Sequence, residues 1–341
     1  IFLLLYVTGV INGVDAFIDY YIRHEHVFYF AGRVTIALFG LLSVYILYQL
    51  GKMYGGRTTG LMAAFFLALN PLHIENSHYA TVDVLMVFFM LPAWVYLYKI
   101  FKGGGQADYV KAGIFFGLSV ITKLPAILFL IPLLLFYVFS VLEIRTLYHF
   151  NRQSRNMFIL LFVAGILTAV GEPGYVKGMR GTLKSTLTLF SEKQAIDPAS
   201  PTSTPSPAAL QSGAAGNTYA YYFDALKKDV GIPMLMLFAV ALIFWVVKKD
   251  RFAYLMLSFT VVYLFIISGT TAFWHYQRYL LPVSPLIFLI SARGISEAAD
   301  RLAVSFGAQR VLFIAGLFAA LVIFPIYAEA IQVSRSFGLP N

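Results

Sequence analysis

Long apolar runs, separated by short polar stretches, make up most of the chain. Several runs approach 20 residues, about the number that a helix needs to cross roughly 30 Å of hydrocarbon. The pattern therefore predicts an all-α integral membrane protein, a polytopic helical bundle of about ten spans. The predicted spans are 31–51, 58–72, 82–101, 109–122, 125–142, 156–171, 231–247, 252–269, 279–292 and 309–328.

The polar breaks divide the chain into four expected parts. Ile1–Val14 is too short to span, so the first part is expected to be the end of a truncated span or an interfacial helix. The second part has an outer loop at 73–82. The third is hydrophilic, and its Pro-, Ser-, Ala- and Gly-rich stretch 197–217 is typical of a flexible linker. The parts are residues 1–30, 31–171 (the N-terminal transmembrane half), 172–230 (an extracytoplasmic loop) and 231–341 (the C-terminal spans).

A proline separates two neighbouring spans. Pro125 follows Lys123 and Leu124, and proline disfavours helix in the residue before it. We therefore expect 109–142 to form two spans with a tight turn at Lys123, rather than one very long helix.

Lysine and arginine are unevenly divided between the two sets of short loops. One set holds fourteen of them and the other holds five, and cytoplasmic loops are the richer ones in membrane proteins. The loops around 73–82, Lys123 and 275–278 are therefore expected on the extracytoplasmic face. The five basic residues on that face are Arg23, Arg33, Lys123, Arg278 and Arg335.

Composition agrees with a membrane protein. Of the 341 residues, 60% are hydrophobic and 12% are charged, where a soluble domain carries roughly 25% charged residues. The net charge of +9 fits cytoplasmic loops beside anionic lipid, and no basic helix stands apart from the spans, so we reject a nucleic-acid partner. Cysteine is absent, which excludes disulfides and thiolate metal sites.

Titratable residues gather in the stretch NPLHIENSHYATVDVLMVFF, residues 70–89. Asp83 lies at the mouth of a span, where it either faces a watery cavity or is a carboxylate stabilised by the helix N-terminus. His73 and His78 are five residues apart, so one helical face does not hold both. Loop polarity explains them better than a metal site, although a histidine there could donate a hydrogen bond to a phosphate.

A second stretch, FWHYQRYLLPVSP at 273–285, places Arg278 among aromatics at the start of a span. Arg278 is either an interfacial arginine snorkelling between anchors or a fork of donors for phosphate. Lys123 offers the same choice on the same face. His275 is a further candidate for substrate binding in this stretch.

These residues resemble the GT-C glycosyltransferases, in particular the protein mannosyltransferase and aminoarabinose transferase group. GRVTIALFGLLSVYILYQLGKMYGGRTTGLMAAFFLALNPLHIENSHYATVDVLMVFF resembles the first block of that group, and GLSVITKLP its G-L-x-x-x-T-K-x-P hairpin. YYFDALKKDVGIPML and QRYLLPVSPLIFL resemble later blocks. The likeness covers about residues 28–295.

The resemblance implies a membrane transferase that moves a sugar from a polyprenyl-phosphate donor to a protein, lipid or glycan acceptor. It implies a bacterial or archaeal plasma membrane, an active face outside, and apolar grooves for the lipid chain. Asp83 matches the second acidic position of the family, Lys123 its T-K position and Arg278 an arginine before its Y-x-L-P segment. From these matches we expect Asp83 to be an auxiliary or acceptor-orienting acid, with Arg278 as phosphate clamp and Lys123 assisting.

The family's principal acidic residue lies in a first outer loop that this chain is expected to lack, since Asp15, Asp19 and Glu25 come too late to match it. His73, His78 and His275 remain weaker substrate-binding candidates. No cofactor and no metal ligand are assigned, and members of the superfamily differ in metal use, which leaves a divalent metal open.

Two other classes are weighed against the transferase. A secondary transporter or lipid flippase would also have a polar cavity, but it more often carries charges at the midplane and broken helices in both halves. A noncatalytic scaffold would tolerate Asp83→Asn and Arg278→Ala. No nucleotide-binding G-x-x-x-x-G-K-[ST] is present, which argues against a nucleotide-driven pump.

Overall fold

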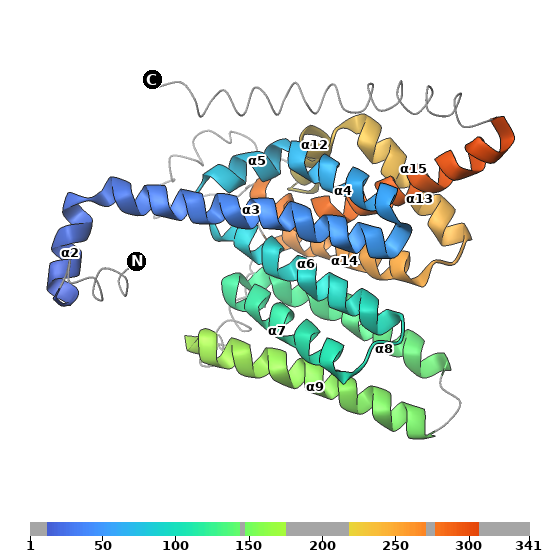
Figure 1. The fold of residues 1–341 in the computed structure, drawn as a ribbon, viewed down its shortest axis with the longest axis horizontal. Coiled ribbons are helices and arrows are strands. Elements are labelled where there is room, and N and C mark those ends of the chain that lie inside the picture. The colour runs from blue at the N-terminus through green and yellow to red at the C-terminus, as the bar shows by residue number, and fades with distance from the viewer. Residues whose placement is uncertain (1–11, 144–146, 175–217, 271–276, 307–341) are drawn as a thin grey trace, which may run out of the picture.

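The computed structural model describes residues 12–143, 147–174, 218–270 and 277–306 (Figure 1). Within these ranges every regular element is a helix, which confirms the all-α prediction. The helices are α2 Val14–Arg23, α3 Glu25–Gly55, α4 Arg57–Leu69, α5 Pro71–His78, α6 Val82–Phe101, α7 Gln106–Thr122, η1 Leu124–Phe129, α8 Leu130–Glu143, α9 Leu147–Gly171, α12 Thr218–Val230, α13 Ile232–Val247, α14 Arg251–Thr270, η2 Gln277–Leu280 and α15 Ser284–Phe306.

Five described helices are long and apolar enough to cross a membrane, and a sixth span results if the bent pair α12 and α13 counts as one. The two helices of that pair meet at 99°. The ten expected spans are therefore not confirmed. The apolar run at 58–72 illustrates why, because its helix α4 has only 13 residues and is about 20 Å long. The last expected span, 309–328, lies outside the described residues.

The helices pack side by side with α6 at the centre (Figure 1). One side of α6 packs against α3 and the other against α7, which in turn packs on α9. Helices α4 and α15 complete the side of the bundle nearest α3. Figure 1 also shows the N-terminal end of α3 and the whole of α2 projecting from the bundle.

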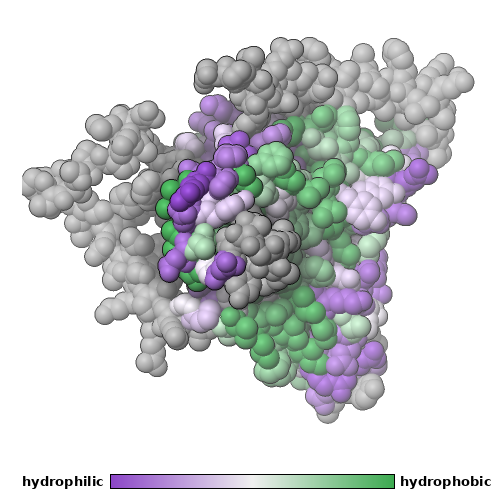
Figure 2. Space-filling model, turned by 60° about the vertical axis from the view of Figure 1, so that its left-hand side comes forward, coloured by the Kyte–Doolittle hydropathy of each residue, from purple (hydrophilic) through white to green (hydrophobic). Residues whose placement is uncertain are grey.

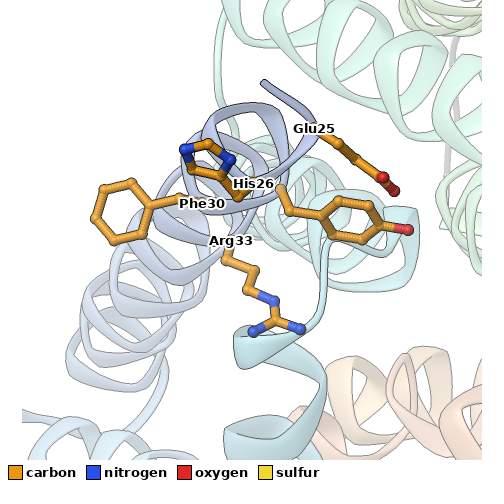
Figure 3. Close-up of a pocket in the computed structure, with 5 residues that line it drawn as sticks. Glu25, His26, Phe30 and Arg33 are labelled. Atoms are coloured by element: carbon orange, nitrogen blue, oxygen red, sulfur yellow. The ribbon is translucent and has the colours of Figure 1, made fainter. Parts of the chain in front are cut away.

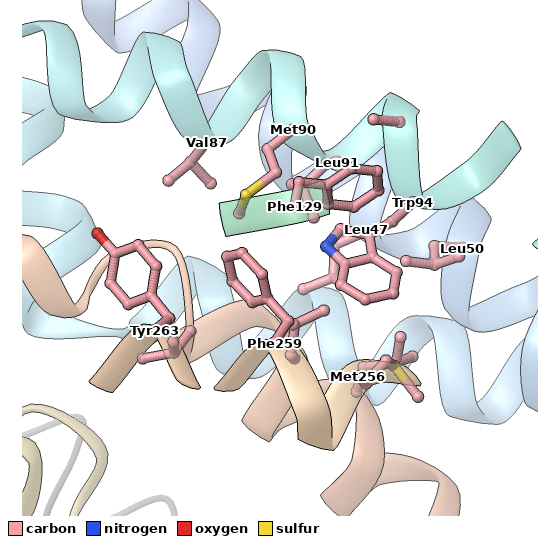
Figure 4. Packing of buried hydrophobic residues seen from close by; sticks show 14 of the residues in the cluster. Leu47, Leu50, Val87, Met90, Leu91, Trp94, Phe129, Met256, Phe259 and Tyr263 are labelled. Carbon is pink, nitrogen blue, oxygen red and sulfur yellow. The ribbon is translucent and has the colours of Figure 1, made fainter. Parts of the chain in front are cut away.

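Aromatic rings fill the centre of this bundle (Figure 4). Trp94 of α6 is fully buried and meets the rings of Phe129, Phe252 and Phe259 edge to face, with ring centroids 4.9 to 6.0 Å apart. These three rings come from η1 and α14, so one side chain of α6 joins segments far apart in sequence. Edge-to-face aromatic pairs are stabilising beyond the area that they bury.

Large apolar side chains also cover the outside of the bundle. In Figure 2 hydrophobic residues form a broad area on the visible face, and hydrophilic residues gather toward its edges. Leu41 of α3, Phe158 of α9 and Phe265 of α14 are among those mostly exposed. An apolar surface of this extent fits contact with lipid.

The chain breaks where proline was expected to break it. α7 ends at Thr122, Lys123 is extended with φ −160° and ψ 128°, and a short 3₁₀ helix holding Pro125 leads into α8. The polar stretch expected as an outer loop at 73–82 differs from the prediction, because most of it is helix α5. Asn70 caps that helix by accepting a hydrogen bond from the His73 backbone N–H at 2.8 Å, and Pro71 occupies its first turn.

Candidate functional site

Asp83, Lys123 and Arg278 come together at one end of the bundle. The Lys123 ammonium donates to Asp83 Oδ1, and Arg278 Nε lies 3.7 Å from Asp83 Oδ2. These are the three residues that the sequence singled out as an acid and two cations. Asp83 and Lys123 are 40 residues apart along the chain, and Lys123 and Arg278 are 155 residues apart, so only the fold brings the three together.

Each of the three residues lies at or beside a point where a helix begins or ends. Asp83 lies in the first turn of α6, where the positive end of the helix dipole favours a carboxylate. Lys123 is the extended residue between α7 and η1. Arg278 lies in η2, just before Pro282 interrupts the chain ahead of α15. Broken backbone at the end of a bundle allows these side chains to converge.

The three charges are buried to different depths. The Asp83 side chain is 2% exposed, whereas Lys123 is 20% and Arg278 is 35% exposed. A carboxylate buried this deeply is costly unless cations and hydrogen bonds compensate its charge. The cations thus lie between the carboxylate and the outside, where a ligand could reach them. Lys123 is also 4.4 Å from the centroid of the Tyr279 ring, a cation–π contact.

A second polar cluster is formed by Asn70, Asp229 and Ser284, which are buried at the ends of helices α5, α12 and α15. Asn70 Nδ2 donates to Asp229 Oδ1 at 2.7 Å and to the Asp229 backbone carbonyl at 3.0 Å. Ser284 Oγ donates to Asp229 Oδ2 at 2.8 Å. Asp229 is the next-to-last residue of α12, and Ser284 begins α15. The three residues therefore join α5, α12 and α15.

The histidine candidates do not join the charged cluster by any hydrogen bond or ion pair described. His73 is buried and its Nε2 lies 3.2 Å from the Gly40 carbonyl of α3. Burial lowers the pKa of His73 to about 4, so its ring is neutral at physiological pH and offers no positive charge to a phosphate. His78 is exposed at the end of α5, with Nδ1 2.7 Å from the Ile74 carbonyl. His275 lies outside the described residues.

A separate pocket opens on the projecting part of α3 (Figure 3). It has a volume of about 380 Å³ and is lined by Glu25, His26, Tyr29, Phe30 and Arg33. All five residues belong to a single helix, and Figure 3 shows their side chains spreading in different directions around it. The pocket is therefore a surface hollow apart from the charged cluster.

Metal-binding chemistry finds no ready ligand set in the described ranges, where no group of three His, Asp or Glu side chains is placed to hold an ion. At Asp83 the neighbouring charged groups are cations, which disfavour a metal ion beside them. The described cluster is thus suited to an anion.

Two further residues near the site, Tyr263 and Asp229, are not marked by any motif in the sequence. Tyr263 of α14 is fully buried in the core (Figure 4). Its hydroxyl is close enough to Asp83 and Tyr279 to interact with them electrostatically. That hydroxyl has no hydrogen-bond partner among the described residues. Asp229 is the second of these residues. Its sequence signal was a carboxylate at a helix end directly before an apolar span.

Comparison with known proteins gives one family. Residues 22–170 match the family model of dolichyl-phosphate-mannose-protein mannosyltransferases. A putative mannosyltransferase of Bacillus subtilis strain 168, YkcB, is 34% identical over 105 residues, which are 30% of this chain and 15% of that protein.

Solved structures share the fold. The Archaeoglobus fulgidus oligosaccharyltransferase, solved with a tethered acceptor peptide, aligns with a TM-score of 0.55 and 16% identity over 91% of this chain and 44% of that one. The same archaeal enzyme, AglB, has been solved with an inhibitory peptide and dolichol-phosphate, with a TM-score of 0.55 and 17% identity over 89% of this chain. ArnT from Cupriavidus metallidurans bound to undecaprenyl phosphate aligns with a TM-score of 0.50 and 15% identity over 89% and 61% of the two chains.

The chain thus spans less than two thirds of the length of each of these proteins. The matched family residues include Asp83 and Lys123, whereas Arg278 lies outside that match. The chain is therefore similar to the dolichyl-phosphate-mannose-protein mannosyltransferase family over residues 22–170, and it shares its fold with the archaeal oligosaccharyltransferase and with ArnT.

Proposed function

We propose that this protein transfers a sugar from a polyprenyl-phosphate donor to a hydroxyl or amine of a protein, lipid or glycan acceptor on the extracytoplasmic face. The observation that carries the proposal is the pair of partly exposed cations, Lys123 and Arg278, held by the buried carboxylate of Asp83. The relatives solved with dolichol-phosphate and undecaprenyl phosphate support a polyprenyl-phosphate ligand.

The reaction exchanges one bond for another. The acceptor oxygen or nitrogen forms a bond to the anomeric carbon of the sugar, and the bond from that carbon to the phosphate oxygen breaks. Polyprenyl phosphate leaves with the electron pair, and the acceptor proton passes to a general base. Both oxygens of Asp83 face cations, so the proposal gives the role of base to another acidic side chain.

Charge balance favours the leaving phosphate. One carboxylate and two cations give the cluster a net charge of about +1. A donor phosphodiester carries one negative charge, and the phosphomonoester that leaves carries about −1.5 to −2 at pH 7. The cluster therefore stabilises the product-like charge more than the starting charge, which is the condition for lowering a barrier.

The roles follow from these contacts. Arg278 offers a planar fork of N–H donors suited to phosphate, and Lys123 adds a point charge. Asp83, which is more deeply buried than either cation, orients both of them and holds them in place in the absence of ligand. The exposed apolar surfaces of the helices would hold the polyprenyl chain. This assignment gives Asp83 the part of an auxiliary acid that acts through its neighbours.

Variants of the two cations test the function. We expect Arg278→Ala and Lys123→Ala each to lower release of polyprenyl phosphate from a labelled polyprenyl-phosphate sugar by roughly 10²-fold, the usual cost of removing one transition-state donor. Arg278→Lys should keep part of the activity, since it retains charge without the fork. Arg301→Ala is the matched control, because Arg301 is an exposed arginine that also pairs with a carboxylate, Glu297, at 3.1 Å. Full release by both alanine variants would overturn the site assignment.

A lipid flippase is the second candidate function. The 99° bend between α12 and α13 is the observation in its favour, since broken helices recur in transporters. It predicts labelled donor crossing the bilayer intact, with no polyprenyl phosphate released.

A further inference from the structure

Asp229 is a buried carboxylate that the proposed reaction does not use directly. It is 6% exposed and lies one residue before the end of α12. The next connection, Gly231, has φ +83°, a left-handed conformation that glycine adopts readily, and there the chain turns through 99° into α13. The carboxylate therefore sits at the elbow between two helices.

Its two oxygens reach segments on either side of the candidate site. Oδ1 accepts from Asn70, whose own Oδ1 caps α5 through the His73 backbone N–H. α5 is the helix that leads into the turn before Asp83. The carboxylate is thus linked through one residue to the segment that starts α6.

The other oxygen reaches the segment of Arg278. Oδ2 accepts from the Ser284 hydroxyl, which also lies 3.2 Å from the Leu280 carbonyl at the end of η2. Within that segment the Leu281 N–H donates to the Arg278 carbonyl at 3.2 Å. A continuous set of contacts therefore runs from Asp229 to the turn that carries Arg278.

Acceptor chemistry explains why a carboxylate occupies this position. An ionised Asp offers acceptors only, so both of its oxygens can face donors, here an amide and a hydroxyl. An Asn at the same place would have to turn its own amide N–H group toward one of them. Burial of a carboxylate costs more than burial of an amide, so the presence of Asp at this buried position favours a role in fixing the geometry of both contacts.

We propose that Asp229 is a positioning residue: through Asn70 and Ser284 it fixes the η2 turn relative to α6, and so holds Arg278 over Asp83. The inference rests on the proposed function, since Arg278 is the phosphate clamp in that account. Asp229 does not touch the phosphate and acts only through Arg278.

A double-mutant cycle tests this inference against a merely structural role. We expect Asp229→Asn to lower polyprenyl phosphate release at least 10-fold in the full-length protein, mainly in kcat. In an Arg278→Ala background the same change should cost less than about 2-fold, because its effect has already been lost. An equal loss in both backgrounds would overturn the inference.

A swap of the two side chains tests the contact itself. Asn70→Asp places two carboxylates face to face, and Asp229→Asn places two amides face to face. The combination restores one acceptor and one donor between the side chains and keeps the net charge and the α5 cap, but the backbone carbonyl of residue 229 loses the Asn70 donor. It should therefore recover part of the activity that the single variants lose. A double variant no better than the worse single variant would contradict the proposed pairing.

Asp250→Asn is the matched control for substitution of a bridging carboxylate. Asp250 Oδ2 accepts from the Tyr54 hydroxyl at 3.1 Å, and its Oδ1 caps α14, so it joins segments at the opposite end of the bundle. The Asp250→Asn variant should release polyprenyl phosphate as the wild type does, while its unfolding temperature changes. A loss of release as large as that of Asp229→Asn would contradict the inference.

Hydrogen exchange gives a readout that does not depend on turnover. In Asp229→Asn the Leu281 and Val283 amides, which close the η2 turn, should exchange faster, with α7 and α9 unchanged. Unchanged exchange at both amides would overturn the inference. If the wild type releases no polyprenyl phosphate, the proposed function fails, and exchange alone then decides whether Asp229 fixes the turn.

Discussion

The charge state of individual side chains decides what the site can bind. Asp83 is balanced by two cations, so a phosphate that approaches Lys123 and Arg278 meets net positive charge. His73, by contrast, lies within the packing of α5 on α3 and is neutral. Two titratable residues ten positions apart thus have opposite roles, one electrostatic and one in packing.

The buried His73 predicts a dependence of stability on pH. Its pKa falls from 6.5 to about 4 on folding, so between these values the unfolded chain binds more protons than the folded one. Protonation of His73 therefore does not reduce the free energy of unfolding above about pH 6.5. As the pH falls toward 4, the linkage to His73 lowers that free energy by on the order of 3 kcal/mol. Thermal unfolding in detergent should show wild type losing more stability than His73→Gln between pH 6.5 and 4.5. Parallel curves would contradict this account of His73.

The sequence alone identified Asp83, Lys123 and Arg278 as candidates, but it did not predict that their side chains lie in contact. Each lies beside a visible break, and Pro125 explained the one at Lys123. Their contact depends on how α6, α7 and η2 pack, which hydropathy does not encode. Asp229 went unnoticed for the same reason, because its partner Asn70 is 159 positions away.

At the scale of helices, small residues set how closely neighbours approach. Gly113 of α7 faces α9 so closely that an added Cβ would lie 2.5 Å from the Leu160 backbone carbonyl. A backbone atom cannot move aside as a side-chain tip can. Glycine at such contacts is typical of helices that pack in membranes.

Alanine substitutions on this pair of helices test the close approach. Gly113→Ala should destabilise the protein by about 1 to 3 kcal/mol, because α9 must shift to admit the methyl group. Gly165→Ala on α9 is the control, since nothing lies within 4 Å of the added Cβ. It should be neutral or stabilising by up to about 1 kcal/mol, because alanine favours helix. Thermal unfolding measures the stability of each variant relative to the wild type. An equal loss of stability in Gly113→Ala and Gly165→Ala would contradict the predicted contact.

The number and kind of elements were only partly predictable. Apolar runs located most helices, yet several runs are short helices packed into the bundle rather than full spans. Segment 73–82 was expected as a loop because it is polar, although Asn70 followed by Pro71 is a helix-start signal. A polar helix of eight residues carries too little hydrophobic periodicity to stand out.

For the whole molecule, the described charges collect at two opposite ends. Asp83, Lys123 and Arg278 lie at one end, and Tyr54 meets Asp250 and Arg293 at the other. The lysine and arginine bias predicts that the Asp83 end faces outward. The sidedness is therefore a property to measure in cells.

Single cysteines can report this sidedness, because the sequence contains none. In intact cells Ala80→Cys, beside Asp83, should react with a membrane-impermeant maleimide. Gly105→Cys, in the turn between α6 and α7 where an added Cβ meets nothing, should react only after permeabilisation. The reverse pattern would place the charged cluster on the cytoplasmic side.

Transfer of an isotopic label from donor to acceptor directly tests whether this protein is a sugar transferase. Membranes holding the full-length protein would be given polyprenyl phosphate carrying a ¹³C-labelled sugar, and the label would be followed by mass spectrometry. The account predicts that the label becomes covalently attached to an acceptor as polyprenyl phosphate is released, and that this stops in the Arg278→Ala variant. Label that stays on the lipid while crossing the bilayer, or transfer that continues in the variant, would contradict it.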